Sequence, residues 1–168
     1  MLNRQQLYFG TVATKIALAR SLYEQHGKAL LADPAICAQL ATLSGLSQAL
    51  ADKMAALKMG ECCTQCGCRA NGGCCSAYMA NETDAVLLLI NLLQGHEVAR
   101  QREDEVECLF LNGQTGCTLS PKPMFCLNYN CRHILAQDPT LLASLATATG
   151  DILRGQTALE EDILHRIR

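Results

Sequence analysis

The sequence contains no tryptophan, and aromatic residues make up only 4% of it. It also has no excess of positive charge, because 16 Asp and Glu residues outnumber 14 Lys and Arg residues and give a formal net charge of -2. Proteins that bind nucleic acid need a basic face for the phosphates, and many use aromatic side chains on which bases stack. We therefore expect no nucleic acid among the partners of this chain.

Long hydrophobic runs are missing as well. The most apolar window, residues 85–93, is interrupted by Asn91 and is far shorter than the roughly 20 residues that cross a bilayer. Polar and charged residues interrupt residues 7–22, so the N-terminus offers no apolar run before a small-residue cleavage site. We expect a cytoplasmic protein that has no membrane partner and keeps its cysteines reduced.

Apolar residues at helical spacing, with capping residues at the ends, predict a mostly α fold. Asp33-Pro34 places a cap and a first-turn proline side by side, and Ser44-Gly45 marks a point where the second helix could break or kink. In chain order, we expect helices over residues 3–27, 34–60 and 81–95, from residue 139 through 145, and in a last segment containing Leu159, Ile163 and Ile167.

Two cysteine-rich loops and one small β-hairpin are expected between these helices. Residues 61–80 have no usable period and contain glycines that mark a loop. Cys108 and Cys117 lie on short apolar stretches around a glycine-bearing turn, which predicts the hairpin. At this length, residues 1–168 are expected to form a single helical domain that frames a cysteine-rich metal-binding region at 61–133.

Cysteine is the residue that the chain has in excess. Ten of the 11 cysteines lie between Cys62 and Cys131, and only Cys37 stands apart, where we expect a small buried hydrophobe. The spacing of Cys63-Thr-Gln-Cys66 lets two thiolates from one tight turn reach the same metal. Because thiols at this density oxidise and exchange when they are left unused, the pattern predicts a thiolate-bound metal centre.

The arrangement of the cysteines favours an iron–sulfur cluster of the 4Fe-4S type. Structural zinc sites usually show two C-x2-C pairs, whereas here a single pair is followed by scattered cysteines that could each bind one iron. A cluster implies a redox function, or an accessory one, with a protein redox or enzyme partner. A structural zinc site in an adaptor module is the alternative.

Metal storage and cysteine-dependent catalysis have less support. The cysteines lie in predicted loops rather than along helix faces, and no Cys-His-Asp set stands out in the sequence. We therefore assign no catalytic residue, and whether the chain is an enzyme stays open.

The order of these motifs resembles the CxxCxxCC family of zinc- or iron-chelating proteins. The likeness covers roughly residues 61–133, and flagellin lysine methylases have a similar cysteine region. It rests on Cys63-Thr-Gln-Cys66, Gly73-Cys74-Cys75, Cys108-Leu-Phe-Leu, Gly116-Cys117-Thr-Leu and Lys122-Pro-Met-Phe-Cys126. The resemblance implies bound zinc or an iron–sulfur cluster, with ligands among Cys63, Cys66, Cys74, Cys75, Cys108, Cys117 and Cys126.

Two departures from the family pattern leave the ligand set open. The gap between Cys66 and Cys74 is longer than the compact family spacing, so Cys68 could replace one ligand. The family ending Arg-Pro-x-x-Cys-Arg has no Arg after Cys126, while Cys131-Arg132 supplies that pair five residues later. Cys131 is therefore the eighth candidate metal ligand and a rival to Cys126.

Overall fold

The computed structural model describes residues 4–59, 61–62, 75–99, 106–112, 116–128, 132–136 and 139–168. Their fold is mostly α, as the sequence predicts. Its elements in chain order are α1 (Arg4–Tyr8), α2 (Val12–Ala32), α3 (Pro34–Ala56), the 3-10 helix η1 (Ala77–Glu82), α5 (Ala85–Leu93), β1 (Leu111–Asn112), β2 (Gly116–Cys117), α6 (Met124–Asn128), α7 (Arg132–Leu135) and α8 (Pro139–Arg166).

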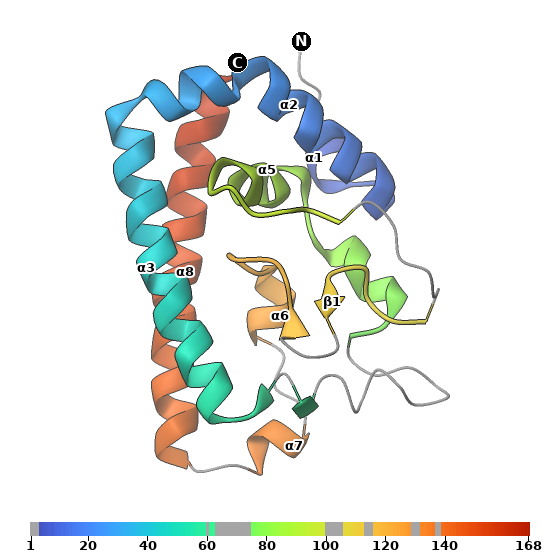
Figure 1. Cartoon of the computed structure of the whole chain (residues 1–168), viewed down its shortest axis with the longest axis vertical. Coiled ribbons are helices and arrows are strands. Elements are labelled where there is room, and N and C mark those ends of the chain that lie inside the picture. The colour runs from blue at the N-terminus through green and yellow to red at the C-terminus, as the bar shows by residue number, and fades with distance from the viewer. Residues whose placement is uncertain are drawn as a thin grey trace.

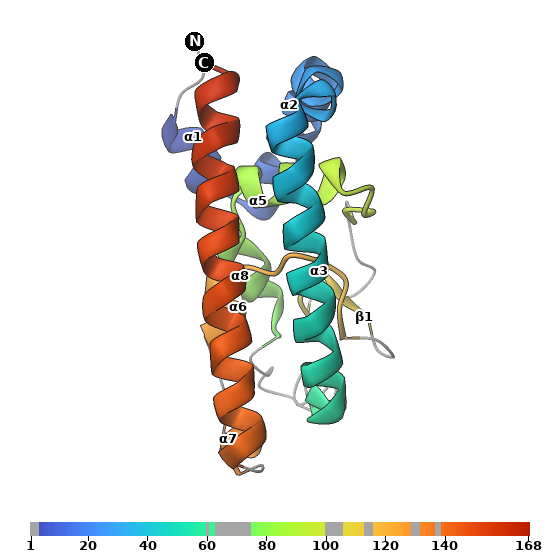
Figure 2. The same ribbon diagram turned by 90° about the vertical axis from the view of Figure 1, so that its left-hand side faces the viewer.

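The two longest helices, α3 and α8, form the backbone of the fold. They lie side by side along the long axis of the molecule and run in opposite directions (Figures 1 and 2). Their contact is apolar, because α3 buries a stripe that includes Ile36 and Leu43 and α8 buries one that includes Ile152 and Leu159. Such stripes recur every three or four residues and keep one side of each helix against its neighbour.

Helices α2 and α3 meet at a capped corner. Asp33 ends α2 and caps α3, and its carboxylate accepts hydrogen bonds from the backbone N–H groups of Ala35 and Ile36 at 2.8 and 3.2 Å. The guanidinium of Arg166 lies 2.5 Å from the same carboxylate, so the end of α8 is tied to this corner. The cap and first-turn proline predicted at Asp33-Pro34 are confirmed.

Helix α5 lies beside α8 and below α2 in Figure 1, and it packs against both of these helices. Eight of its nine residues are buried. The carboxylate of Asp84 accepts a hydrogen bond from the N–H of Leu87 at 2.7 Å and caps the helix, and Gly95 follows its end with a φ of 80°. This predicted helix is confirmed, but its predicted start at Asn81 is wrong, because Asn81 lies in η1 and Asp84 is the residue that caps α5.

Four other predicted helix boundaries are wrong. The first predicted helix is split at Gly10, whose φ of 109° favours glycine, and Thr11 then caps α2, which continues past the buried Gly27 to Ala32. Helix α3 runs unbroken through Ser44-Gly45 and ends at Ala56, before Gly60, which lies outside the described residues. Tertiary packing of an apolar stripe outweighs a helix cost of about 1 kcal/mol per glycine.

At the C-terminal side, one helix replaces the two that the sequence predicts. α8 continues through Gly150 and Gly155 because its apolar stripe stays in contact with α3 on both sides of these glycines. The short helices α6 and α7 were not predicted, since four or five residues are too few to show a helical period.

No single helix in the described ranges has both the length and the apolar composition needed to cross a bilayer. Helices α2 and α3 reach that length and composition only as a pair, and they meet at a bend of 100°.

Candidate metal centre

The two cysteine-bearing segments of the sequence meet in a short antiparallel pairing. Ser76 and Glu107 form a β-bridge, which is flanked by a hydrogen bond of 2.7 Å from the N–H of Cys108 to the carbonyl of Cys75. A second bond of 2.9 Å joins the N–H of Ala77 to the carbonyl of Val106. In this register, Cys75 lies opposite Cys108, and opposite residues project to the same side of an antiparallel pair.

Cys117 lies on a strand that pairs with the backbone that follows Cys108. The chain turns after Cys108, whose carbonyl accepts a hydrogen bond of 2.9 Å from the N–H of Leu111 at the start of β1. Leu111 is then paired with Cys117 of β2 in the two-stranded sheet. Backbone pairing thus connects Cys75, Cys108 and Cys117 in turn.

The predicted hairpin is confirmed for Cys117 and wrong for Cys108. Cys117 lies in β2, whereas Cys108 lies three residues before β1 and pairs with the segment that carries Cys75. The reason is that each strand has only two residues, so the backbone of Cys108 remains available for the other cysteine segment.

These three cysteines lie against the hydrophobic core. Cys108 is 9% exposed, and the partly buried Cys75 and Cys117 pack against the same core. Burial raises the pKa of the Cys117 thiol, while the nearby Lys122 ammonium and a hydrogen bond from the N–H of Leu119 act in the opposite direction. A thiolate in such a place needs a compensating cation, and a bound metal ion can provide it.

A buried polar clamp fixes the backbone that follows Cys117. The wholly buried amide of Asn91 in α5 accepts a hydrogen bond of 2.7 Å from the N–H of Ser120 and donates one of 3.0 Å to the carbonyl of Pro121. The amide of Gln156 in α8 donates a bond of 2.9 Å to the carbonyl of Lys122. We call residues 120–122 the clamped turn, and it connects Cys117 to α6, which carries Cys126.

The structure describes four of the eight candidate ligands. Cys75, Cys108, Cys117 and the half-buried Cys126 are described, while Cys63, Cys66, Cys74 and Cys131 lie outside the described residues. Among the residues that are described, no group of three or more His, Cys, Asp and Glu side chains could hold a metal ion. The complete ligand set therefore stays a prediction.

The prediction for Cys37 is wrong. Its side chain is exposed, and its thiol lies 3.1 Å from the carbonyl of Leu31. Because Ile36 points into the core at the start of α3, the next residue along the helix turns away from it.

Sequence reasoning also missed Asn91 and Gln156, whose side chains form hydrogen bonds with the backbone of the clamped turn. Asn91 carried a usable signal, since it is the one polar residue in an otherwise apolar window. Gln156 carried none, because a glutamine in a polar stretch of helix is ordinary.

The comparisons with known proteins found no matching family model, no matching curated protein and no matching solved structure. The resemblance to the CxxCxxCC family therefore stays a prediction that rests on the quoted motifs.

Replacing Asn91 by Leu should destabilise the fold. Leucine has a similar size but leaves the N–H of Ser120 and the carbonyl of Pro121 buried without this partner. We expect the free energy of unfolding to fall by about 2–4 kcal/mol, measured by urea denaturation monitored by circular dichroism. The exposed Gln48→Leu should stay within about 0.5 kcal/mol of the wild type. Equal losses in both variants would contradict the clamp.

In protein treated with a reductant and a chelator, the thiols of Cys37 and Cys117 should be alkylated at different rates. Cys37 is exposed, whereas burial hinders access to Cys117 and raises its pKa. At neutral pH, iodoacetamide should modify Cys37 at least about tenfold faster, as measured by peptide mass spectrometry over time. Unfolding in urea should remove the difference, and equal rates in the folded protein would refute the burial of Cys117.

Proposed function

We propose that this chain binds an iron–sulfur cluster through cysteines of region 61–133 and acts in electron transfer or as an accessory to a partner enzyme. The observation that carries the proposal is the hydrogen bond from the N–H of Cys108 to the carbonyl of Cys75, with the bridge beside it. It joins two cysteine-bearing segments that are more than 30 residues apart in the sequence. Thiolates from separate loops can share one cluster only when those loops lie close together.

The donor chemistry fits a metal that prefers sulfur. The predicted ligands are all cysteines, and thiolates select iron–sulfur clusters, zinc or copper(I) over oxygen-loving ions such as magnesium. A cluster, when bound, would supply one-electron chemistry, whereas the protein would hold it and shield it from water.

The surroundings of Cys108 and Cys117 suit such a centre. Phe110 and Leu119, which lie close to these cysteines in sequence, are almost completely buried. The ammonium of Lys122 near Cys117 would offset part of the negative charge of thiolates. Because Asn91 and Gln156 fix the backbone of the clamped turn, the positions of Cys117 and Lys122 would change little when a cluster binds.

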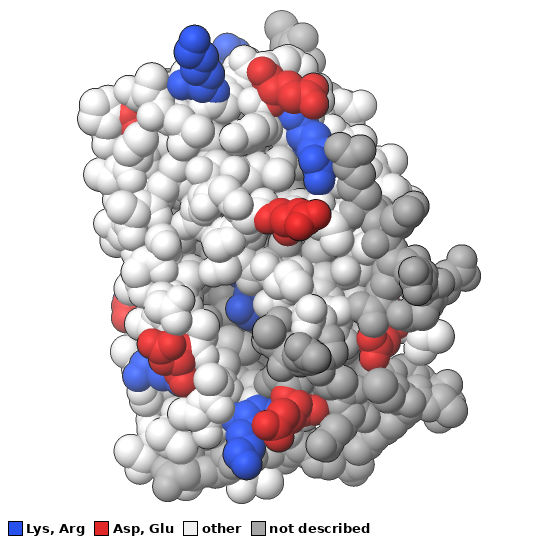
Figure 3. All heavy atoms as spheres, in the orientation of Figure 1, with Lys and Arg blue, Asp and Glu red and all other residues white. Residues whose placement is uncertain are grey.

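A protein partner fits the described surface better than nucleic acid does. On the face shown in Figure 3, acidic and basic side chains are scattered over a largely uncharged surface, and Lys and Arg do not gather into one patch. Next to Cys126, the side chains of Met124 and Phe125 are 66% and 45% exposed. Exposed apolar side chains beside a redox centre are suited to contact with another protein.

Anaerobic purification from iron-replete cells tests the proposal. We expect brown protein with broad visible absorption, bound iron and acid-labile sulfide. Colourless protein that contains zinc and no sulfide would contradict the cluster and support the structural zinc site instead.

Replacing single cysteines should separate ligands from bystanders. Cys66→Ser and Cys117→Ser should each lose most of the bound iron and melt at a lower temperature, because metal binding is coupled to folding. The exposed Cys37→Ser is the matched control and should keep the iron content of the wild type. Iron and sulfide analysis with thermal melts measures both effects. Unchanged iron in both ligand variants would overturn the assignment.

A further inference from the structure

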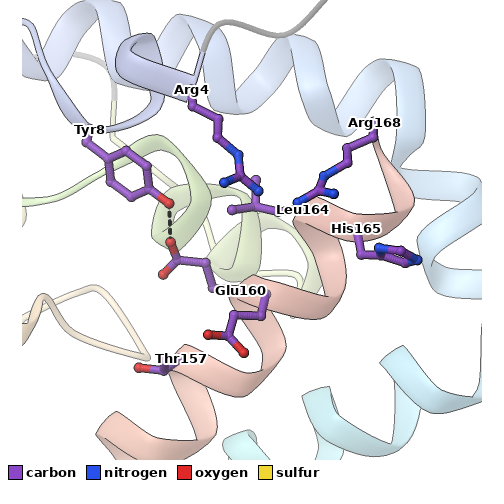
Figure 4. Close-up of a pocket in the computed structure, with 8 residues that line it drawn as sticks. Arg4, Tyr8, Thr157, Glu160, Leu164, His165 and Arg168 are labelled. Atoms are coloured by element: carbon purple, nitrogen blue, oxygen red, sulfur yellow. Dashed lines mark hydrogen bonds between the residues drawn. The ribbon is translucent and has the colours of Figure 1, made fainter.

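An open groove of about 500 Å³ lies between α1 and the C-terminal part of α8 (Figure 4). It is formed by elements other than those that carry the candidate ligands of the metal centre. Arg4 and Tyr8 come from α1, and the other lining residues are Thr157, Glu160, Glu161, Leu164, His165 and Arg168.

The lining residues from the C-terminal part of the chain fall on one face of α8 and its continuation. They recur at steps of three, one, three, one and three residues, which is the spacing of neighbours along one side of a helix. Leu164, which is 7% exposed, forms an apolar floor between the acidic residues of one turn and Arg168 one turn later. The backbone positions of Glu161 and Arg168 are thus separated along the direction of α8 by roughly two turns, or about 10 Å.

One end of the groove holds two guanidinium groups. The side chains of Arg4 and Arg168 extend toward each other above Leu164 (Figure 4). Within the described part of the chain, neither of them forms an ion pair, although carboxylates line the same groove. Guanidinium groups repel one another and bind carboxylates with paired hydrogen bonds, so this end is suited to a carboxylate.

The other end of the groove is acidic. The hydroxyl of Tyr8 donates a hydrogen bond to the carboxylate of Glu160, which holds this side chain in place from the opposite wall (Figure 4). Glu161 lies beside it, exposed and without an ion pair in the described residues. Burial and the negative charges of Asp84 and Glu161 raise the pKa of Glu160, while the hydrogen bond from Tyr8 acts in the opposite direction. The negative charges gathered at this end disfavour an additional anion and favour a cation.

We propose that this groove binds a small zwitterion in which a short hydrocarbon chain joins an ammonium group to a carboxylate. The carboxylate lies between Arg4 and Arg168, the chain crosses Leu164, and the ammonium group lies at Glu160 and Glu161. A simple anion or a simple amine would satisfy one end and leave like charges unpaired at the other. The ligand class follows from this order of basic, apolar and acidic groups along the groove.

Binding of 6-aminohexanoate to the purified full-length chain tests the proposal. Hexanoate and hexylamine are matched probes that each lack one charge. Isothermal titration calorimetry should show that both bind at least about tenfold more weakly than 6-aminohexanoate, because each loses a charged hydrogen-bonded contact. Equal affinity for hexanoate would make this a simple anion site and would overturn the proposal, as would no binding of 6-aminohexanoate.

Variants should show which end binds which group. Arg168→Gln should weaken binding of 6-aminohexanoate by about tenfold and leave hexylamine binding unchanged, while Glu161→Gln should weaken both ligands. Arg154→Gln is the control, since this arginine lies on α8 outside the groove and pairs with Asp151. All three positions are exposed, so each variant should keep the wild-type melting temperature and iron content. Loss of affinity in the control, or none in the groove variants, would overturn the assignment.

Discussion

The described fold depends on a nearly complete burial of α5. A helix with eight of nine residues buried has to be enclosed by other elements, and α2, α8 and the segment after β2 contribute to that enclosure. Its one polar residue, Asn91, cannot reach water and therefore bonds to the backbone of the clamped turn. A buried amide without hydrogen-bond partners would be costly, so the position of Asn91 in the core determines where the clamped turn after Cys117 lies.

This constraint explains how a region with little regular structure can hold cysteines in place. β1 and β2 have two residues each, and an isolated pair of such strands is not stable in water. Its position comes from the bridge to the segment after Cys75 on one side and from the clamp on the other. In our proposal, the metal would add the remaining connections, as it does in many small metal-binding regions.

The sequence predicted what depends on local physics. The cap at Asp33, the mostly α class and the hairpin strand of Cys117 follow from short-range patterns and are confirmed. It failed where long-range contacts decide: glycines stay helical in α8 because α3 packs along it, and Cys108 pairs with a distant segment. The ligand set rests on the resemblance of the cysteine motifs to a known family and stays a prediction for all eight cysteines, four of which lie outside the described residues.

The unbroken course of α8 has a functional consequence that two separate helices would not have. Gln156 faces the clamped turn, while the next residue, Thr157, lines the groove. Adjacent residues point in different directions around a helix, so one turn of α8 contacts both the second cysteine segment and the groove. The two proposed sites therefore share a scaffold while each keeps its own chemistry, sulfur ligands at one and paired charges at the other.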